Sequence, residues 1–421
     1  MSITRNTQYY KFSFYGFLKN LRFFDAFFVL FLIEKELPYT QIGILYAIRE
    51  VAINLCEIPS GFIADTYGRK NALLGSFLIF IISFCVFYIS NSFWLFFVAF
   101  ILYGIGDAFR SGAHKGMMMD YLRLNHWEDQ KINYYGHTRS WSQKGSALSS
   151  LLAGMIVFYS GTYENIFLYS IIPYVLNFLL ILSYPNKINH SLKVNSIKKN
   201  RMGFTIKSFF EIIKKPVVFK IINSSAVHSA YLKAVKDYIQ PLMVNISLII
   251  PLMLNIEVAK KNGIIIGVIY FFIYLLTSMA SMYSSKAWSK NKAHISNITL
   301  ISGFVFGILC GVFFIYEFWI ISIIAFVAIY VIENIRKPIL TGFVADQVPN
   351  EILTSVLSAQ SLLKTIITVI LALAFGVIAD HHGIGISFFI ISAFLALTTI
   401  FVNNLAFVNK TIRIFRKKNL L

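Results

Sequence analysis

Long apolar segments recur along the whole chain, and short polar segments separate them. Each apolar segment is close to the length of about 20 residues that a helix needs to cross the hydrocarbon core of a bilayer. The twelve segments are 12–33, 42–64, 72–89, 93–119, 136–159, 165–184, 216–243, 263–283, 295–315, 318–344, 353–378 and 385–407. The pattern therefore predicts an all-α integral membrane protein with twelve transmembrane helices.

A longer polar stretch in the middle of the chain divides these segments into two sets of six. Residues 185–207 contain six Lys and Arg and no acid, which is the composition of a solvated linker. We therefore expect an N-terminal six-helix bundle at 1–184, a basic cytoplasmic linker with an interfacial helix at 185–215, and a C-terminal six-helix bundle with a basic tail at 216–421.

The composition argues against a soluble nucleic-acid-binding protein. Of the 421 residues, 57% are hydrophobic and 14% are charged, whereas a soluble domain is about one quarter charged. The 38 Lys and Arg exceed the 19 Asp and Glu. A mean hydropathy of +0.68 nevertheless leaves too little polar surface for a face that binds nucleic acid. The positive charge therefore has to be explained in the context of a bilayer.

Basic residues outside the apolar segments predict the orientation, because cytoplasmic loops retain Lys and Arg. With the N-terminus inside, the even-numbered loops and both ends of the chain are cytoplasmic. Besides the linker, they hold Arg5, Lys11, Arg69, Lys70, Arg123, Lys131, Lys286, Lys290, Lys292, Lys410, Arg413, Arg416, Lys417 and Lys418. The odd-numbered loops hold Lys35, Lys260 and Lys261. We expect a multi-pass protein of the plasma (inner) membrane with both termini in the cytoplasm, where its basic residues meet anionic lipid headgroups.

Residues 61–70, between the second and third segments, read Gly-Phe-Ile-Ala-Asp-Thr-Tyr-Gly-Arg-Lys. Gly61 permits close helix contact, and Gly68 permits an unusual backbone conformation. Asp65 can accept hydrogen bonds from the N-terminus of a neighbouring helix. This loop resembles the signature loop of the major facilitator superfamily (MFS), in which Gly, three residues, Asp, two residues and Gly precede Arg and a basic residue. Thr66 departs from the family pattern, which has Arg after the Asp.

The resemblance covers the whole chain, because the twelve segments, the basic linker and the place of the loop all agree with it. It implies the MFS fold, in which two six-helix bundles are built from inverted three-helix repeats. In this family the loop and an acid at the end of helix 4 latch the two halves together on the cytoplasmic side. The matching gating residues are Gly61, Asp65, Gly68, Arg69 and Asp120. A second copy of the pattern, at 376–383, ends the eleventh segment on the opposite face, as an inverted repeat implies.

Many ionisable side chains lie within the apolar segments. Each costs about 2.5 to 3.5 kcal/mol on insertion scales, so each is expected to face a cavity or a partner. The resemblance implies that helices 1, 4, 7 and 10 line a central cavity, and these helices hold most of the ionisable groups. Cations outnumber acids among them, and we therefore expect a cavity that binds an anion. The predicted substrate-binding residues are Arg110, Arg139, Lys233, Lys236, Gln240 and Lys364.

A structural interpretation of the same charges stays open, because several acids and bases follow each other on one helix face at spacings of three or four residues. Such pairs would hold helices together without binding a substrate. The candidate pairs are Asp107 with Arg110, Lys233 with Asp237, and Glu333 with Lys337.

Proton coupling needs a group that changes its protonation during the transport cycle. Desolvation and nearby charges both act on a carboxyl group at bilayer depth. We predict Asp25, Asp107 and Glu50 for this role, and Asp25 and Asp107 each lie three residues from an Arg. His114 shares the helix face of Asp107 and is either a proton shuttle or a packed polar residue.

Motifs of other functional classes do not occur in the sequence. There is no Gly-rich loop ending in Gly-Lys-Ser or Gly-Lys-Thr, as ATP-driven transport would require, and neither His-Glu-x-x-His nor a nucleophile elbow indicates an enzyme. His381 and His382 have no third ligand nearby, so we expect neither a metal nor a cofactor.

We therefore predict a proton-coupled secondary transporter of a small organic anion that works as a monomer by alternating access. Export of lipophilic drug-like compounds in exchange for protons is the alternative. A membrane-embedded enzyme is a weaker one.

Overall fold

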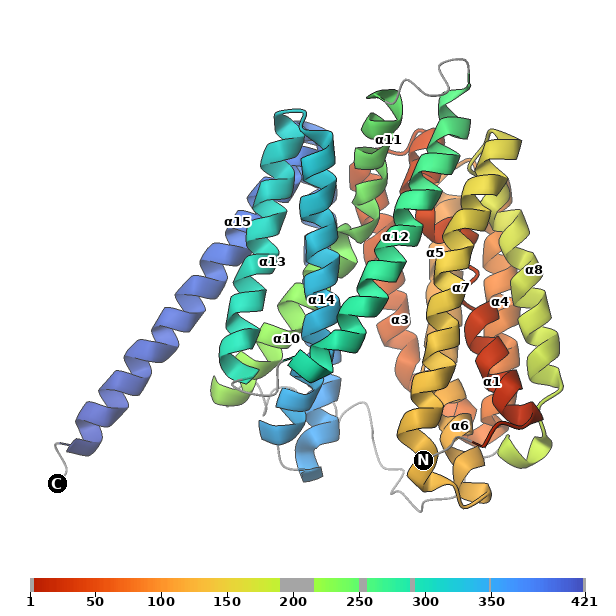
Figure 1. The fold of residues 1–421 in the computed structure, drawn as a ribbon, viewed down its shortest axis with the longest axis horizontal. Coiled ribbons are helices and arrows are strands. Elements are labelled where there is room, and N and C mark those ends of the chain that lie inside the picture. Colours follow the sequence, from red (N-terminus) through yellow and green to blue (C-terminus); the bar gives the residue numbers. More distant parts are fainter. Residues whose placement is uncertain (1–3, 190–215, 250–255, 288–291, 348–349, 419–421) are drawn as a thin grey trace.

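The computed structural model describes residues 4–189, 216–249, 256–287, 292–347 and 350–418, and these residues are almost entirely helical (Figure 1). The N-terminal half contains α1 (Thr7–Leu18), η1 (Phe23–Ala26), α2 (Phe28–Glu34), α3 (Tyr39–Tyr67), α4 (Arg69–Ile89), α5 (Phe93–Arg110), α6 (Ala113–Leu124), η2 (Glu128–Gln130), α7 (Lys131–Ser160), α8 (Asn165–Leu182) and η3 (Asn186–Ile188). The C-terminal half contains α10 (Pro216–Val235), η4 (Lys236–Tyr238), α11 (Ile239–Ile249), α12 (Val258–Ala287), α13 (Lys292–Ile315), α14 (Trp319–Gln347) and α15 (Asn350–Lys418).

Twelve membrane crossings account for these helices, six in each half. The helix α15 supplies the last two, because its backbone leaves helical geometry at Gly383, with φ 83° and ψ 165°. A residue with a Cβ rarely adopts that φ, so glycine is suited to the sharp reversal. The twelve helices predicted from the apolar segments are therefore confirmed, in two bundles of six.

Three of the crossings predicted as continuous helices are interrupted near their middle. The first divides into α1, η1 and α2, the fourth divides into α5 and α6 at Gly112 with φ 75°, and the seventh divides into α10, η4 and α11. Apolar periodicity could not predict these breaks, because each depends on polar groups that satisfy the freed backbone. After α1, for example, the carbonyl of Lys19 accepts hydrogen bonds from Arg22 Nε at 3.3 Å and from the Tyr174 hydroxyl at 3.4 Å. Irregular backbone at membrane depth is tolerated where such partners exist.

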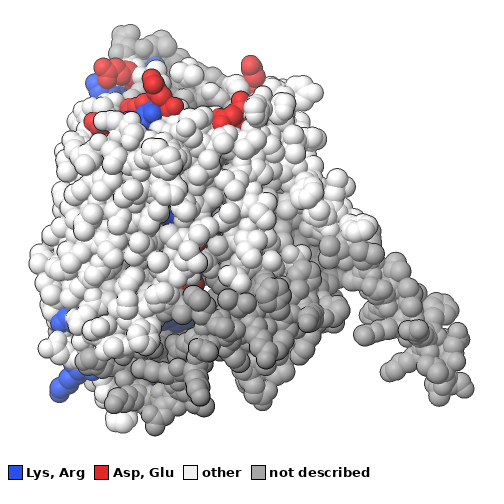
Figure 2. Space-filling model, turned by 180° about the vertical axis from the view of Figure 1, so that it is seen from behind, with Lys and Arg blue, Asp and Glu red and all other residues white. Residues whose placement is uncertain are grey.

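The surface is organised as expected for a protein surrounded by lipid. Seven stretches of the described helices are long and apolar enough to cross a membrane by length and composition. Figure 2 shows a broad band with few charged atoms between two ends where charged side chains gather. Large apolar side chains are exposed on several of the helices, for example Ile82, Ile172, Phe272 and Phe394. The chain is therefore a multi-pass membrane protein.

Aromatic packing fills the interior of the N-terminal bundle. Phe28 stacks on Phe100 with ring centroids 5.1 Å apart, and Phe167 stacks on Phe87 at 4.9 Å and on Phe24 at 5.7 Å. Such aromatic pairs contribute about 0.5 to 1.5 kcal/mol beyond the area they bury. Lipid tails are as apolar as these side chains, so the shape of the packing rather than exclusion from water holds the helices together.

The two bundles meet along two helix pairs, α3 with α15 and α7 with α12. A Cβ at Gly43 would lie against the backbone of Ala372 and Gly376, and a Cβ at Gly154 would lie against the backbone of Gly263 and Gly267. Each of these glycines lies near the end of the molecule where α3 begins and α7 ends, which we call the closed end. Both chain termini lie at the opposite end, which we call the terminal end (Figure 1). Small residues therefore let the bundles approach closely at the closed end.

Adding a methyl group at Gly154 tests this closure. Gly154→Ala places a Cβ 2.5 Å from the carbonyl oxygen of Gly263, and such overpacking costs about 1 to 3 kcal/mol. We expect the bundles to separate at the closed end. Spin labels at Tyr159 and Val258, in a protein whose three native cysteines are replaced, should show a longer distance by double electron–electron resonance.

The matched control for this prediction is Gly136→Ala in the same helix, where no atom lies within 4 Å of the added Cβ. It should leave the distance unchanged. An equal distance distribution in Gly154→Ala, Gly136→Ala and the parent protein would contradict the close-packing account.

Candidate functional site

A polar cavity of about 410 Å³ opens within the N-terminal bundle, between α1, the α5–α6 break and α7. Its lining includes four cationic side chains and an imidazole: Lys19, Arg110, Lys115, Arg139 and His114. No Asp or Glu belongs to the described lining. The cavity is therefore a concave site with an excess of positive charge.

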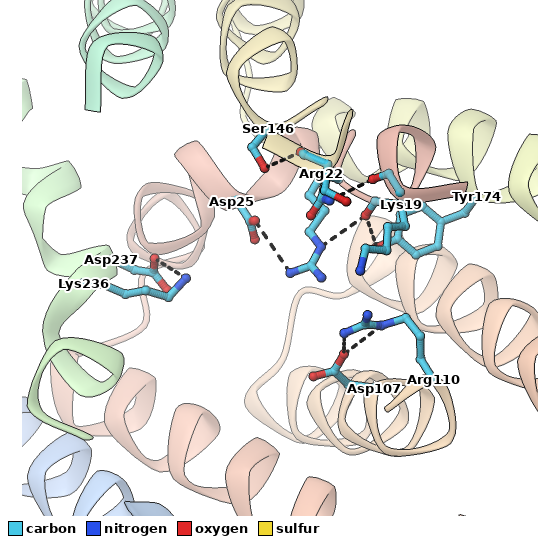
Figure 3. Close-up of polar contacts among 12 residues, drawn as sticks. Lys19, Arg22, Asp25, Asp107, Arg110, Ser146, Tyr174, Lys236 and Asp237 are labelled. Atoms are coloured by element: carbon cyan, nitrogen blue, oxygen red, sulfur yellow. Dashed lines mark hydrogen bonds and ion pairs between the residues drawn. The ribbon is translucent and has the colours of Figure 1, made fainter. Parts of the chain in front are cut away.

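The helix breaks bring these cations together. Figure 3 shows Lys19, Arg22 and Arg110 turned toward one another from the α1–η1 break and the end of α5. Asp107 forms an ion pair with Arg110, and the Arg22 guanidinium lies 3.8 Å from the Asp25 carboxylate. One acid therefore accompanies Arg110 and another accompanies Arg22, while Lys19 and Arg139 form no ion pair with any described residue.

Aromatic rings form one wall of the cavity. The rings of Tyr15 and His114 stack with centroids 3.6 Å apart and an interplanar angle of 6°. The Nε2 atom of His114 lies 3.3 Å from the hydroxyl of Tyr184. Of the two interpretations of His114, this geometry favours the packed polar residue, because the ring is held on one face and at one nitrogen.

The predicted cations of the seventh crossing lie across from this group, in the C-terminal bundle. Lys233 forms an ion pair with Glu50 of α3, and Lys236 lies 3.3 Å from Asp237. The predicted pairing of Lys233 with Asp237 is therefore replaced by two others, one of which joins the bundles. Glu50 is 1% exposed and also lies 3.4 Å from Arg49.

Gln240 also joins the two bundles, and it does so through the backbone of the first crossing. Its side-chain oxygen accepts hydrogen bonds from the amides of Val29 at 2.8 Å and Leu30 at 3.4 Å, and its amide nitrogen donates to the carbonyl of Asp25 at 2.9 Å. The residue is fully buried. Lys364 in α15 is half-buried and forms no ion pair with a described residue.

Apart from Lys364, the predicted substrate-binding residues thus divide into three groups. Arg110 and Arg139 line the cavity, Lys233 and Lys236 are paired with acids, and Gln240 braces the bundles. All three predicted coupling acids lie beside a cation: Asp25 beside Arg22, Asp107 beside Arg110 and Glu50 beside both Arg49 and Lys233.

The gating loop forms a connected set of contacts at the terminal end. Arg69 lies 2.5 Å from the carboxylate of Asp120, at the end of α6, and Arg123 lies 3.5 Å from the same carboxylate. The Arg69 amide donates to the carbonyl of Asn189 at 2.7 Å. These contacts tie the loop to the fourth crossing and to the start of the linker, all on the N-terminal side of the molecule.

The glycines of this loop have different surroundings. Gly68 has φ 100° and lies against the side chain of Asn189, whereas no atom lies within 4 Å of a Cβ built at Gly61. The side chain of Asp65 lies outside the described part of the structure.

The second copy of the loop pattern closes the opposite end. The two carboxylate oxygens of Asp380 accept hydrogen bonds from the amides of Tyr39 and Thr40, each at 2.7 Å. These amides belong to the first turn of α3, where Pro38 supplies no side-chain cap. An acid of the C-terminal bundle therefore caps a helix of the N-terminal bundle, where the helix dipole favours negative charge.

Two groups of polar residues, one in each bundle, were not predicted from the sequence. Lys19 and Tyr15 belong to the cavity, although their segment reads as an ordinary apolar helix; the polar run Lys19-Asn20 was the available signal. In the C-terminal bundle, His228 Nδ1 lies 2.7 Å from Glu333 Oε2, and only the fold brings these residues together.

Comparison with known proteins agrees with this architecture. The sequence profile of the Major Facilitator Superfamily matches residues 16–360. An uncharacterized MFS-type transporter of Bacillus subtilis, YxaM, is 23% identical over 387 residues, which is 90% of each chain.

Solved structures with the same fold include several transporters. The nucleoside transporter NupG superposes with a TM-score of 0.73 at 12% identity, over 94% of this chain and 99% of that chain. The transporter PepTSo of the POT family gives 0.73 at 11% identity over 97% and 99%, and a D-xylose–proton symporter gives 0.66 at 14% identity over 94% and 95%. At these identities the likeness concerns the fold alone.

Removing the charge of Asp380 tests the cap. Asp380→Asn weakens the interaction with the first turn of α3 by about 1 kcal/mol, or about fivefold in the balance between closed and separated bundles. Spin labels at Glu36 and His382 should report a larger population at long distance.

His381→Asn is the matched control, because it changes the neighbouring residue and leaves the carboxylate in place. An identical shift in both variants would show that the loop, and not the Asp380 carboxylate, sets the closure.

Proposed function

The chain belongs to the Major Facilitator Superfamily, and from this membership we propose that it is a secondary active transporter of a small organic anion, coupled to protons. The observation that carries the proposal is the cavity of about 410 Å³ whose described charged lining consists of cations. Clustered cations at membrane depth repel one another and lose hydration, and a bound anion relieves both effects.

Within this cavity Lys19 and Arg139 are the primary anion-binding groups. Arg110 already holds Asp107, whereas Lys19 and Arg139 have no carboxylate partner among the described residues. The Arg139 guanidinium presents a planar fork of donors that suits a carboxylate or a phosphate group. The aromatic wall of Tyr15 and His114 would contact the less polar part of the substrate.

Lys233 and Glu50 could connect substrate binding with movement of the bundles. Their ion pair crosses between α10 and α3. An anion that reaches Lys233 competes with Glu50, and a proton on Glu50 has the same effect, because it removes the carboxylate charge. Among the three predicted coupling acids, Glu50 is thus the one whose protonation would act directly on contact between the bundles. Lys236, Gln240 and Lys364, which also belong to the C-terminal bundle, are secondary candidates for substrate binding.

We infer that the terminal end faces the cytoplasm and that the protein lies in the plasma (inner) membrane. At the terminal end the described bases, among them Arg69, Lys70, Arg123 and Lys187, outnumber the acids Asp120, Glu128 and Asp129. At the closed end the described acids outnumber the bases, which are Lys35, Lys260 and Lys261; the acids are Glu34, Glu36, Glu164, Glu257, Glu317 and Asp380. This asymmetry agrees with retention of basic residues on the cytoplasmic side. With this orientation the contacts of the closed end give an inward-facing conformation, and rocking of the bundles would expose the site to the outside.

Competition in inside-out vesicles with an imposed pH gradient tests the substrate class. Labelled succinate, lactate and glycerol 3-phosphate serve as anionic probes, and labelled tetraphenylphosphonium serves as the lipophilic cation. Gradient-dependent movement of at least one anion supports the proposal. If only the cation moves, the proposal is wrong and the protein is a drug–proton antiporter.

Neutralising Arg139 should weaken anion binding without destabilising the protein. Its side chain is exposed to the cavity and leaves no buried acid unpaired, whereas removal of Arg110 would strand Asp107. One hydrogen-bonded charge contributes about 1.5 to 3 kcal/mol, so Arg139→Gln should raise KM for the transported anion about 10- to 100-fold.

Lys187→Gln, in η3 outside the cavity, is the matched control and should leave KM unchanged. An unaltered KM in Arg139→Gln would remove Arg139 from the binding site.

A further inference from the structure

A second group of buried polar side chains lies in the C-terminal bundle, apart from the cationic cavity. His228 of α10 is fully buried, and its Nδ1 atom lies 2.7 Å from Oε2 of Glu333 in α14. The hydroxyl of Ser229 donates a hydrogen bond to the other carboxylate oxygen, Oε1. Glu333 therefore binds an imidazole with one oxygen and a hydroxyl with the other.

This set of partners distinguishes Glu333 from the other described acids at membrane depth. Glu50 is paired with Lys233, Asp107 with Arg110 and Asp237 with Lys236. A carboxylate that is held by Lys or Arg stays ionised over a wide pH range. Glu333 instead contacts an imidazole, which can be neutral near physiological pH, and a hydroxyl, which carries no charge.

The site keeps its hydrogen bonds in either protonation state. With Glu333 ionised, Nδ1–H of His228 donates to Oε2 and Ser229 donates to Oε1. When Oε1 takes up a proton, the Ser229 hydroxyl can rotate and accept from it, because a hydroxyl is both donor and acceptor. The bond between His228 and Oε2 is unchanged by this step.

The surroundings of the imidazole direct the added proton to the carboxylate. Nε2 of His228 is buried without a hydrogen-bond partner among the described residues and lies against α13 at Gly303. A proton placed there would be a buried donor without an acceptor, which costs about 1 to 3 kcal/mol. The rings of Tyr231 and Phe304 flank the imidazole and offer no charge to offset it.

Two further cations act on Glu333. Arg336, one turn along α14, donates to the hydroxyl of Thr299 at 2.7 Å and to the carbonyl of Ser224 at 2.8 Å. Lys364 of α15 also interacts electrostatically with Glu333. Arg336 thereby ties α14 to α13 and α10, so a change of charge on Glu333 acts on the contacts among these helices.

We propose that Glu333, His228 and Ser229 form a proton-binding site of the C-terminal bundle, with Glu333 as the group that takes up the transported proton. This inference rests on the proposed proton-coupled transport. It places a proton site in the half of the molecule that does not contain the cationic cavity. Ser229 and Lys233 are one turn apart on α10, so the site lies next to the ion pair that joins the bundles.

Infrared difference spectroscopy tests proton uptake without any substrate. The full-length protein is reconstituted in vesicles of phosphatidylethanolamine and phosphatidylglycerol and titrated from acid to alkaline pH. We expect a protonated-carboxyl band that Glu333→Gln abolishes and Glu317→Gln, in an exposed loop, retains. A band that persists at full size in Glu333→Gln overturns the proposal. If Glu333→Gln does not fold, Glu333→Asp replaces it, and an unchanged titration midpoint overturns the proposal.

Transport measurements distinguish an error in the proposed proton site from an error in the proposed transport function. The probe is the anion of the vesicle screen that moves with the pH gradient in the parent protein. In Glu333→Gln we expect acceleration by the gradient to be lost while exchange of labelled for unlabelled anion at equal pH continues. Full acceleration in this variant overturns the site alone. Absence of gradient-driven transport in the parent protein overturns the proposed coupling, and with it the site.

Discussion

The cost of placing a charged side chain inside a bilayer governs this structure more than any other constraint. Each such group needs a partner or a polar cavity. The described acids at membrane depth meet this need in different ways: Asp107 within its own helix, Glu50 across the two bundles, and Glu333 with a histidine. The helix breaks follow from the same constraint, because the cations of the cavity gather where α1 and α5 end and the freed backbone groups find polar partners.

The closed end shows how packing and electrostatics cooperate in joining the bundles. Glycines bring α3 against α15 and α7 against α12, and the resulting approach lets Asp380 reach the first turn of α3. At the terminal end, Arg69 of the loop at 61–70 binds Asp120 within the N-terminal half. The two copies of one sequence pattern thus make different contacts in this conformation. Contacts between the bundles form at one end only while the bundles are close there. Alternating access requires the bundles to close at one end when they separate at the other.

Much of the fold could be predicted from the sequence, since membrane crossings depend on local hydropathy and helix length. The loop at 61–70 and its second copy at 376–383 also identified the family and indicated that its three-helix repeats are inverted. The ion pairs could not be predicted in the same way, because spacing on one helix identifies only partners within that helix. Asp107 and Arg110 pair within one helix, as their spacing predicts. Lys233 instead binds Glu50 on another helix, and Glu333 binds His228 on another helix. The cavity lining at Lys19 depends on a helix break that apolar periodicity does not record.

The arrangement of partners implies a division of roles between the bundles. Arginine holds its proton across the physiological range, so the Arg110 and Arg139 guanidinium groups would give the cavity of the N-terminal bundle a lasting positive charge for a bound anion. The glutamate–histidine pair of the C-terminal bundle differs from the other acid–base pairs, because its carboxylate has no direct Lys or Arg ion pair among the described residues. Lys233 lies between them, paired with Glu50 and one turn from Ser229. A charge that changes on either side would therefore act on the same bundle-joining ion pair, which provides a physical route by which binding of an anion and binding of a proton can depend on each other.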